Sequence, residues 1–280
     1  MTTSTLRSSN YTALQPLADA EFNFFRQWLF QNSGITLNDS KKSLVSGRLS
    51  KRIAKLGLGS FSAYLKIIRS GDKEEAQVLL NILTTNETYF FREHKHFEFM
   101  QSVILPDLKQ AGKVSVWSAA ASTGEEAYTV ALIMADAFGL HGPWSVTGTD
   151  INTEVLSIGQ RAIYPIEASV KIPESYRKKY CLKGKGKDQG LFRICGELRK
   201  QVNFTQHNLM QPYAGTERFN LVFLRNVLIY FDLEEKKEIL RHVMNSMTPG
   251  GWLLVGHSES ITGYSERIKQ YQPGCYRLIS

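Results

Sequence analysis

The chain has 280 residues, of which 42% are hydrophobic and 21% are charged, as is typical of globular proteins long enough for two domains. The three cysteines are odd in number and show no metal-ligand spacing, which argues against a disulfide scaffold and favours a reducing, cytoplasmic setting. The first twenty residues are polar, and no apolar run approaches a membrane span, so we expect neither a signal peptide nor membrane insertion. The formal net charge of +8 predicts an acidic partner.

The N-terminal part of the chain is predicted to consist of short helices up to about residue 84. Three apolar-periodic segments follow Asp19, Asp39 and Ser60, each of which can cap a helix, and each segment ends at glycine or other small residues. Residues 1–84 contain 11 Lys/Arg and 6 Asp/Glu, a net charge of +5. Under a third of the chain therefore carries more than half of its net charge.

A basic stripe is predicted on the helix that follows Asp39. Its members are seven, four and three residues apart, and they lie opposite the apolar positions Leu44, Val45, Leu49, Ile53 and Leu56. The stripe consists of Lys41, Arg48, Arg52 and Lys55. A solvated charged face is the usual explanation of such a pattern, and docking on an acidic partner is the alternative.

From about residue 112, strands and helices alternate. The strands are expected in "KVSVWSAA", "WSVTGTD", "RFNLVFLRN" and "WLLVGHS", and the helices after Gly124, in "NTEVLSIGQRAIY" and in "DLEEKKEILRHVMNSM", with a turn at Pro249–Gly251. This order predicts an α/β fold with a doubly wound parallel sheet, which binds its ligand at the carboxyl ends of the strands. Residues of about 166–200 interrupt the order with a short polar helix and two strands around "KGKGKDQG", as a small insertion would.

The turn from Ala119 to Gly124 indicates the kind of ligand. Pyrophosphate-binding turns use G-x-G-x-x-G because bare backbone must approach the phosphate, but this turn has one glycine. Glu125 and Glu126 follow it, and each would repel a nearby pyrophosphate by about 4 kcal/mol at intermediate dielectric. NAD and ATP are therefore disfavoured, whereas S-adenosylmethionine (SAM) combines positive charge with a ribose. The alternative is that both glutamates are only favourable first-turn acids.

Asp150 adds to the case for SAM. It ends the second predicted strand, 26 residues after Gly124, where an acid can accept both ribose hydroxyls. The alternative role is to cap the next helix, and Asn152 fits that role better.

Six segments together resemble the chemotaxis receptor methyltransferases, the CheR family. They are "LTTNETYFFRE", "WSAAASTGEEAY", "GTDIN", "NLM", "RNVLIYF" and "GHSE", and they follow one another in this order over nearly the whole chain. The resemblance implies a helical receptor-docking domain in residues 1–90 and a Rossmann-like SAM-dependent methyltransferase domain in residues 91–280, with a β-subdomain at about 166–200. It also implies methylation of glutamate side chains on the cytoplasmic helices of bacterial chemoreceptors during adaptation, with S-adenosylhomocysteine as the second product.

The resemblance further implies the site residues. The cofactor contacts would be Asn86, Thr88, Arg92, Glu126, Asp150, Asn208, Leu209, Asn226 and Val227. Arg92 and Tyr230 would hold the acceptor carboxylate. For Asn86 and Thr88 the alternative role is helix-end capping, for Val227 it is core packing, and for Tyr230 it is an aromatic closing the core. Glu87 and Tyr89 depart from the family pattern, and no function is transferred to them.

The implied reaction makes few demands on the protein. A glutamate carboxylate is already deprotonated near pH 7 and sulfonium is a good leaving group, so we expect neither a general base nor a metal. Alignment of the reacting groups supplies the catalysis. The resemblance also gives the basic stripe a use in docking on acidic receptor helices. In some members the β-subdomain adds the receptor's C-terminal tether as an extra strand.

Two alternatives belong to other classes. The positive charge also suits a nucleic-acid methyltransferase. Against it, "RNVLIYF" lacks an Asn-Pro-Pro-Tyr type segment, and none of the cysteines lies at that strand end. A SAM-binding regulator without catalysis is the second alternative, and the presence of Arg92 and Tyr230 argues against it. We therefore expect no nucleic acid among the partners.

Overall fold

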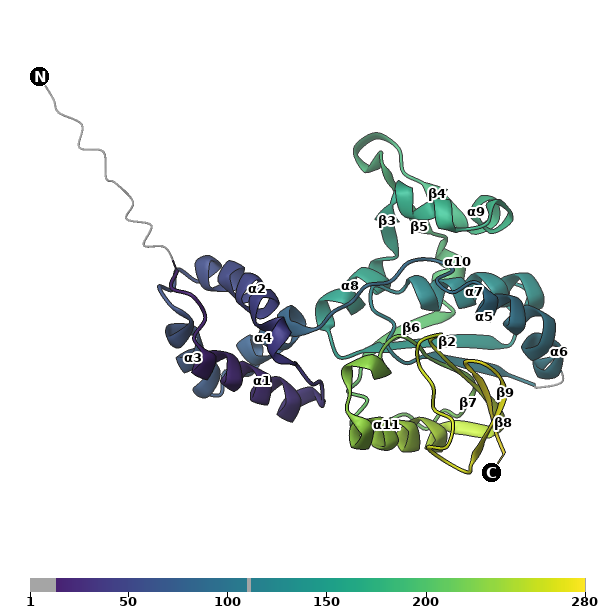
Figure 1. Cartoon of the computed structure of the whole chain (residues 1–280). Helices are drawn as coiled ribbons and strands as arrows, with labels where there is room; N and C mark the ends of the chain where they lie inside the picture. Colours follow the sequence, from purple (N-terminus) through teal and green to yellow (C-terminus); the bar gives the residue numbers. More distant parts are fainter. Residues whose placement is uncertain (1–13, 110–111, 280) are drawn as a thin grey trace, which may run out of the picture. The chain divides into compact units, whose positions relative to one another are not determined.

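The computed structural model describes residues 14–109 and 112–279, and it divides them into two compact units (Figure 1). One unit comprises the described residues up to Asn32 together with Leu37–Leu83. The other comprises Ser33–Thr36 and the described residues from Thr84 onward. None of the helices in the described ranges is both long enough and apolar enough to cross a membrane.

The first unit is helical. Its elements are α1 (Asp19–Ser33), the short 3-10 helix η1 (Asp39–Lys41), α2 (Lys42–Lys55), α3 (Phe61–Arg69) and α4 (Lys73–Leu83). Ser60 caps α3 as predicted, because its hydroxyl accepts a hydrogen bond from the backbone N–H of Ala63. The fully buried side chains of Phe25, Leu29 and Tyr64 form the core together with apolar residues of α2 and α4.

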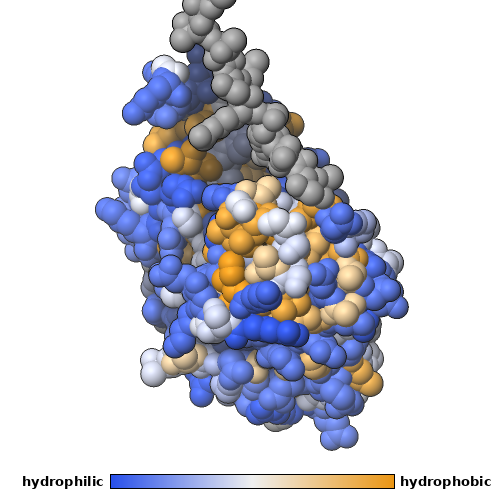
Figure 2. All heavy atoms as spheres, turned by 90° about the vertical axis from the view of Figure 1, so that its left-hand side faces the viewer, coloured by the Kyte–Doolittle hydropathy of each residue, from blue (hydrophilic) through white to orange (hydrophobic). Residues whose placement is uncertain are grey.

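Some large apolar side chains of this unit remain exposed. They include Phe30, Leu44 and Leu56, so the buried face of α2 is narrower than the sequence predicts and centres on Val45, Leu49 and Ile53. Figure 2 shows an apolar area bordered by hydrophilic residues on the face of the molecule seen there.

The second unit is built on a seven-stranded sheet in the order β6-β2-β1-β7-β8-β10-β9. The strands are β1 (Val114–Ser118), β2 (Trp144–Asp150), β6 (Val202–Gln206), β7 (Phe219–Leu224), β8 (Met247–Val255), β9 (Ile268–Gln272) and β10 (Cys275–Leu278). The first five strands in the spatial order are mutually parallel, and β10 and β9 complete the sheet as antiparallel strands. The predicted doubly wound sheet is therefore present with an antiparallel edge, and its strand order reverses between β1 and β7.

Helices cover both faces of this sheet, which explains why the central strands have almost continuous apolar runs. Val114 and Val116 of β1 pack in the same core as α7 (Glu125–Phe138) and α5 (Lys95–Phe99). Trp117 of the same strand packs on the other face with apolar residues of α11 (Leu233–Asn245). Figure 1 shows α7 and α11 on opposite sides of the sheet. The remaining helical segments of the core are the π-helix η2 (Met100–Ile104), α6 (Leu105–Leu108), α8 (Thr153–Arg161) and η5 (Leu228–Tyr230).

The predicted insertion contains the expected short helix and two strands, together with further short turns. Its elements are η3 (Ile166–Lys171), α9 (Glu174–Tyr180), β4 (Cys181–Lys183), η4 (Gly186–Asp188), β5 (Leu191–Ile194) and α10 (Gly196–Arg199). The small sheet has the order β3-β5-β4, and its first strand, β3 (Ile163–Pro165), precedes the predicted range. Helix α8 was predicted through Tyr164, but it ends at Arg161 because Ala162 adopts a left-handed conformation with φ of 53°.

Candidate cofactor and acceptor site

The turn that follows β1 is held closely against its neighbours. Gly124 precedes α7 with φ of 95°, and a Cβ atom there would lie 2.9 Å from Phe204 and 3.0 Å from the Cα atom of Gly159. Only glycine fits this position, since other residues would meet both a strained backbone and a clash. The backbone N–H of Ala121 donates to the carbonyl of Thr149 at 2.8 Å, which ties the turn to the end of β2.

Asp150 lies at that end of β2 and contacts the turn directly. One carboxylate oxygen accepts the backbone N–H of Ser122 at 2.9 Å, and the other accepts that of Asn152 at 3.0 Å. Burial raises the pKa of Asp150, and these backbone hydrogen bonds oppose the increase. Asn152 caps α8 by accepting from the N–H groups of Glu154 and Val155, which confirms that the cap is Asn152 and leaves Asp150 for another role.

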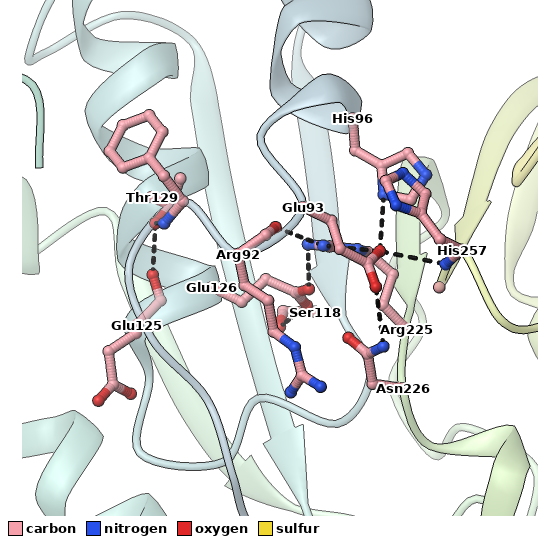
Figure 3. A network of polar contacts seen from close by, with 12 residues as sticks. Arg92, Glu93, His96, Ser118, Glu125, Glu126, Thr129, Arg225, Asn226 and His257 are labelled. Carbon is pink, nitrogen blue, oxygen red and sulfur yellow. Dashed lines mark hydrogen bonds and ion pairs between the residues drawn. The ribbon is translucent and has the colours of Figure 1, made fainter. Parts of the chain in front are cut away.

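A buried arginine joins three of the segments that resemble the family (Figure 3). Arg225 follows β7, and its guanidinium donates to the Glu126 carboxylate at 2.9 Å, to the Glu93 carboxylate at 3.2 Å and to the carbonyl of Arg92. The Arg225 side chain is 1% exposed. The other Glu126 oxygen accepts the hydroxyl of Ser118 at 2.7 Å. The turn after β1, the end of β7 and the segment before α5 thus share one polar network.

The charges of this network are largely compensated within the protein. Burial raises the pKa of Glu126, and the guanidinium of Arg225 opposes that increase. For Glu93, burial acts in the same direction, but hydrogen bonds from Asn226 and Arg225 together hold its pKa below the usual value. Glu126 was expected to face a positively charged ligand; in the structure its charge is paired with Arg225, and contact with the cofactor stays a prediction.

The end of β7 is fixed by two carboxylates. Asn226 has a left-handed backbone with φ of 55°, and its side-chain amide donates to Glu93 at 3.0 Å. The carboxylate of Glu259, on the loop after β8, accepts the backbone N–H groups of Asn226 at 2.7 Å, Gly256 at 2.8 Å and Ile229 at 3.2 Å. The strained conformation of Asn226 therefore persists because the groups on both sides hold it.

Asn86 contacts the turn that follows β1. Its carbonyl accepts the hydroxyl of Ser122 at 2.9 Å, and Thr88 lies two residues further along the segment. Arg92 directs its guanidinium out of the network (Figure 3), where it donates to the carbonyl of Glu87 at 2.6 Å.

The remaining predicted residues follow the ends of β6 and β7. The Asn208 side chain accepts the backbone N–H of Met210 at 3.0 Å, and Leu209 is 8% exposed within the core on the α11 face. Val227 and Tyr230 pack partly buried against that same core, which is the packing role considered as their alternative. All the predicted cofactor residues thus belong to segments at the carboxyl ends of strands or to the segment 86–92.

Three side chains near Arg225 could offer metal ligands. Glu93, His96 and His257 place one ligand atom each within 4.8 Å of one another, and both ring nitrogens of His96 are buried without a hydrogen-bond partner among the described residues. Burial and the nearby Arg225 lower the pKa of His96 to about 4, so the ring is neutral. The Glu93 carboxylate, however, already accepts from Arg225, from Asn226 and from the backbone of His257. We assign this cluster to the polar network.

The basic stripe of the helical unit divides into two kinds of residue. Arg52 was expected to face water, but its side chain is 18% exposed and pairs with the carboxylate of Glu75 on α4. Tyr64 donates to the same carboxylate at 2.7 Å. Arg48 donates to the carbonyls of Ile82 and Leu83 at the end of α4. The expectation of a solvent-facing stripe is therefore wrong for these two arginines, while Lys41 and Lys55 are exposed.

Sequence reasoning missed Arg225, Glu93 and Glu259 as members of the site. The sequence does contain a feature that points to Arg225: it directly follows the apolar run "FNLVFL", and an arginine beside a buried strand is rarely buried unless it is paired. Glu93 had no such signal, since Arg225 and Asn226 lie more than 130 residues away in the chain. Glu259 had none either, since two of its three backbone donors, Asn226 and Ile229, lie 33 and 30 residues away.

In an open α/β sheet whose strand order reverses between β1 and β7, the ligand site lies at the carboxyl ends of the strands, where these polar residues meet. Residues 86–275 match the family model "CheR methyltransferase, SAM binding domain" and residues 20–84 match "CheR methyltransferase, all-alpha domain". The chain belongs to the CheR methyltransferase family and is a SAM-dependent methyltransferase.

Curated relatives extend the similarity over most of the chain. A chemotaxis protein methyltransferase of Escherichia coli strain K12 is 39% identical over 255 residues, which cover 90% of this chain and 88% of the relative. The protein of the same name from Salmonella typhimurium is 39% identical over 258 residues, covering 91% and 88%. Chemotaxis protein methyltransferase 2 of Pseudomonas aeruginosa is 36% identical over 253 residues, covering 89% of each chain.

Proposed function

We propose that the protein transfers the methyl group of SAM to glutamate side chains on the cytoplasmic helices of chemoreceptors, which gives methyl esters in chemotaxis adaptation. The observation that carries the proposal is the convergence of the Asp150, Glu126 and Asn226 segments at one edge of the sheet, in a chain of the CheR family. The relatives named above are chemotaxis methyltransferases, which supports a receptor as the substrate.

The residues present fit SAM. The Asp150 carboxylate accepts backbone N–H groups of Ser122, Asn152 and Ile151, and a carboxylate has about four acceptor sites, so it retains capacity for a ribose hydroxyl. The turn at Gly124 leaves no room for a side chain there, and it lacks the further glycines of a pyrophosphate-binding turn. Asn86, Thr88, Asn208, Leu209, Asn226 and Val227 are the further residues that we propose hold the cofactor, with Glu126 and Arg92.

The residues of the chain have an orienting task in this reaction. SAM supplies a methyl group on a positively charged sulfur, so the acceptor needs no activation by a base or a metal. Arg92 and Tyr230 orient the acceptor carboxylate, and Arg225 fixes the backbone from which Arg92 extends. Arg92 must bind the carboxylate loosely in the ground state, because equal stabilisation of ground and transition states leaves the rate of the chemical step unchanged.

Two surfaces are candidates for receptor docking. Lys41 and Lys55 are exposed on the helical unit and suit an acidic helix, whereas Arg48 and Arg52 contribute to that role only if they exchange internal partners for the receptor. The small sheet has β4 at one edge, and we propose that a receptor's C-terminal tether pairs with this sheet as an added strand.

The test is incubation of the protein with methyl-labelled SAM and a panel of receptor cytoplasmic fragments, with and without their C-terminal tails. We expect label on the fragments that is released by mild base, since a methyl ester hydrolyses under those conditions. Base-stable label on added nucleic acid, with none on the fragments, would replace the proposal by a nucleic-acid methyltransferase. Binding of SAM with no transfer to any fragment would favour a regulator.

A further inference from the structure

Two exposed residues beside Arg92, Tyr89 and Lys171, have no role in the function proposed above. Tyr89 is 43% exposed, and two cations lie next to its ring. The guanidinium carbon of Arg92 is 5.9 Å from the ring centroid, and the ammonium of Lys171 is 5.7 Å from it. Lys171 ends η3 in the insertion, and its neighbour Val170 is 74% exposed. We call Tyr89, Arg92 and Lys171 the Tyr89 cluster.

The position of Tyr89 is imposed by the residues that follow it. Phe90 is 1% exposed and packs edge-on against Tyr164 of β3, with a centroid distance of 5.1 Å. Phe91 stacks on Tyr176 of α9 at 5.9 Å, and its own backbone is left-handed with φ of 57°. Because Phe90 and Phe91 occupy the apolar positions against the insertion, Tyr89 is held at the surface beside Lys171.

The charge of the cluster is uncompensated within the described residues. Across residues 14–109 and 112–279, no carboxylate forms an ion pair with Arg92 or Lys171. The surroundings are also basic, since residues 166–200 contain 10 Lys/Arg and 4 Asp/Glu. The positive charges of Arg92 and Lys171 beside the exposed ring of Tyr89 favour a ligand that has negatively charged groups and, next to them, methylene groups that can pack on the ring.

We propose that the Tyr89 cluster binds the acidic helical segment that carries the acceptor glutamate, with Arg92 on the acceptor carboxylate and Lys171 on a second carboxylate of the same segment. Tyr89 packs against the methylene groups between them. This inference rests on the proposed function and adds two acceptor-recognition residues, Tyr89 and Lys171. It also gives the insertion a contact with the acceptor that does not require a receptor tether.

The test compares three variants of the full-length protein, K171E, Y89A and the control K200E. Lys200 is an exposed lysine of the same insertion, and K200E changes the net charge by the same amount as K171E. We measure kcat and KM with tail-less receptor fragments, the affinity for SAM by calorimetry, and Tm. Exposed side chains are replaced, so Tm should be retained in all three variants.

The expected result is a rise in KM for the receptor fragment in K171E and Y89A of about fivefold or more at low salt, because attraction becomes repulsion or the apolar contact is lost. SAM affinity should change by less than about twofold, because within residues 14–109 and 112–279 the ring contacts of Tyr89 and Lys171 do not involve the turn at 119–124. K200E should match the wild type. A KM in K171E equal to that in K200E, or a parallel loss of SAM affinity, would overturn the assignment. Absence of transfer by the wild type would instead refute the proposed function, and this inference with it.

Discussion

Replacement of Arg225 by methionine should reveal how much the polar network depends on one buried charge. The guanidinium lies 2.9 Å from Glu126 and 3.2 Å from Glu93, and both carboxylates would be left without their cation. Removal of one partner from a buried pair costs about 3–5 kcal/mol. At about 2–4 °C per kcal/mol for a unit of this size, Tm should fall by roughly 6–20 °C.

The sign of the pH dependence follows from the pKa shifts. Arg225 opposes the rise in the pKa of Glu126 and helps to hold the pKa of Glu93 below its usual value. Without it both pKa values rise, so ionised, unpaired carboxylates destabilise the folded state at neutral pH, and protonation relieves them as the pH falls. His96 acts in the same direction, because Arg225 helps to keep its pKa near 4. The stability deficit of R225M should therefore be larger at pH 8 than at pH 5.

Urea unfolding followed by tryptophan fluorescence measures this deficit, since Trp117, Trp144 and Trp252 are buried in the sheet unit. The matched control is R193M, which removes an arginine that is exposed on β5. A loss in R225M no larger than in R193M, or a deficit that is equal at pH 5 and pH 8, would refute the view that this network is an electrostatic unit.

Three further outcomes are expected. D150A should weaken SAM binding by roughly 1.5–3 kcal/mol, the scale of hydrogen bonds to a charged group, and unchanged affinity in calorimetry would remove Asp150 from the site. G124A should lose SAM binding, because φ of 95° and a Cβ contact of 2.9 Å displace the turn; wild-type affinity would show that the turn tolerates a side chain. Arg52 lowers the pKa of Glu75, so R52M should have a smaller free energy of unfolding than the wild type at neutral pH. This difference should shrink as the pH falls below about 4.5 and Glu75 becomes protonated. A difference that does not change with pH would show that Arg52 stabilises the protein by packing.

The sequence predicted best the features that depend on local pattern. Strand β2 was placed at its observed limits, Trp144–Asp150, because a buried parallel strand is a short apolar run with clear ends. The caps Ser60 and Asn152 were likewise identified from side chains that satisfy the first N–H groups of a helix. The prediction of Asp39 as a cap is wrong, because Asp39 lies inside η1 and the residue before α2 is Lys41, which makes no side-chain cap hydrogen bond. Strands β6 and β9 were not anticipated, because these two edge strands are mostly exposed or half-buried and have too few apolar residues to be distinguished from loops. The sequence also missed the short inner strand β10.

Features that depend on distant partners were the ones missed. A helical wheel places Arg52 on a polar face, but it cannot show that Glu75, 23 residues further along the chain on α4, would reach it. The Arg225 network could not be predicted from local pattern either, because Arg225 and its partners are separated by 99 to 133 residues in the chain. The candidate cofactor residues came from the resemblance to the family, and the contacts that hold them in place came from the structure.

The most direct test of the account is the position of the transferred methyl group. The protein, SAM and a tail-less chemoreceptor fragment are incubated, and the digested fragment is sequenced by tandem mass spectrometry before and after mild base. We predict methyl groups on glutamate side chains of the cytoplasmic helices, and their loss after base treatment. Methylation of any other residue type, base-stable methylation, or an unmodified fragment in the presence of bound SAM would contradict the account.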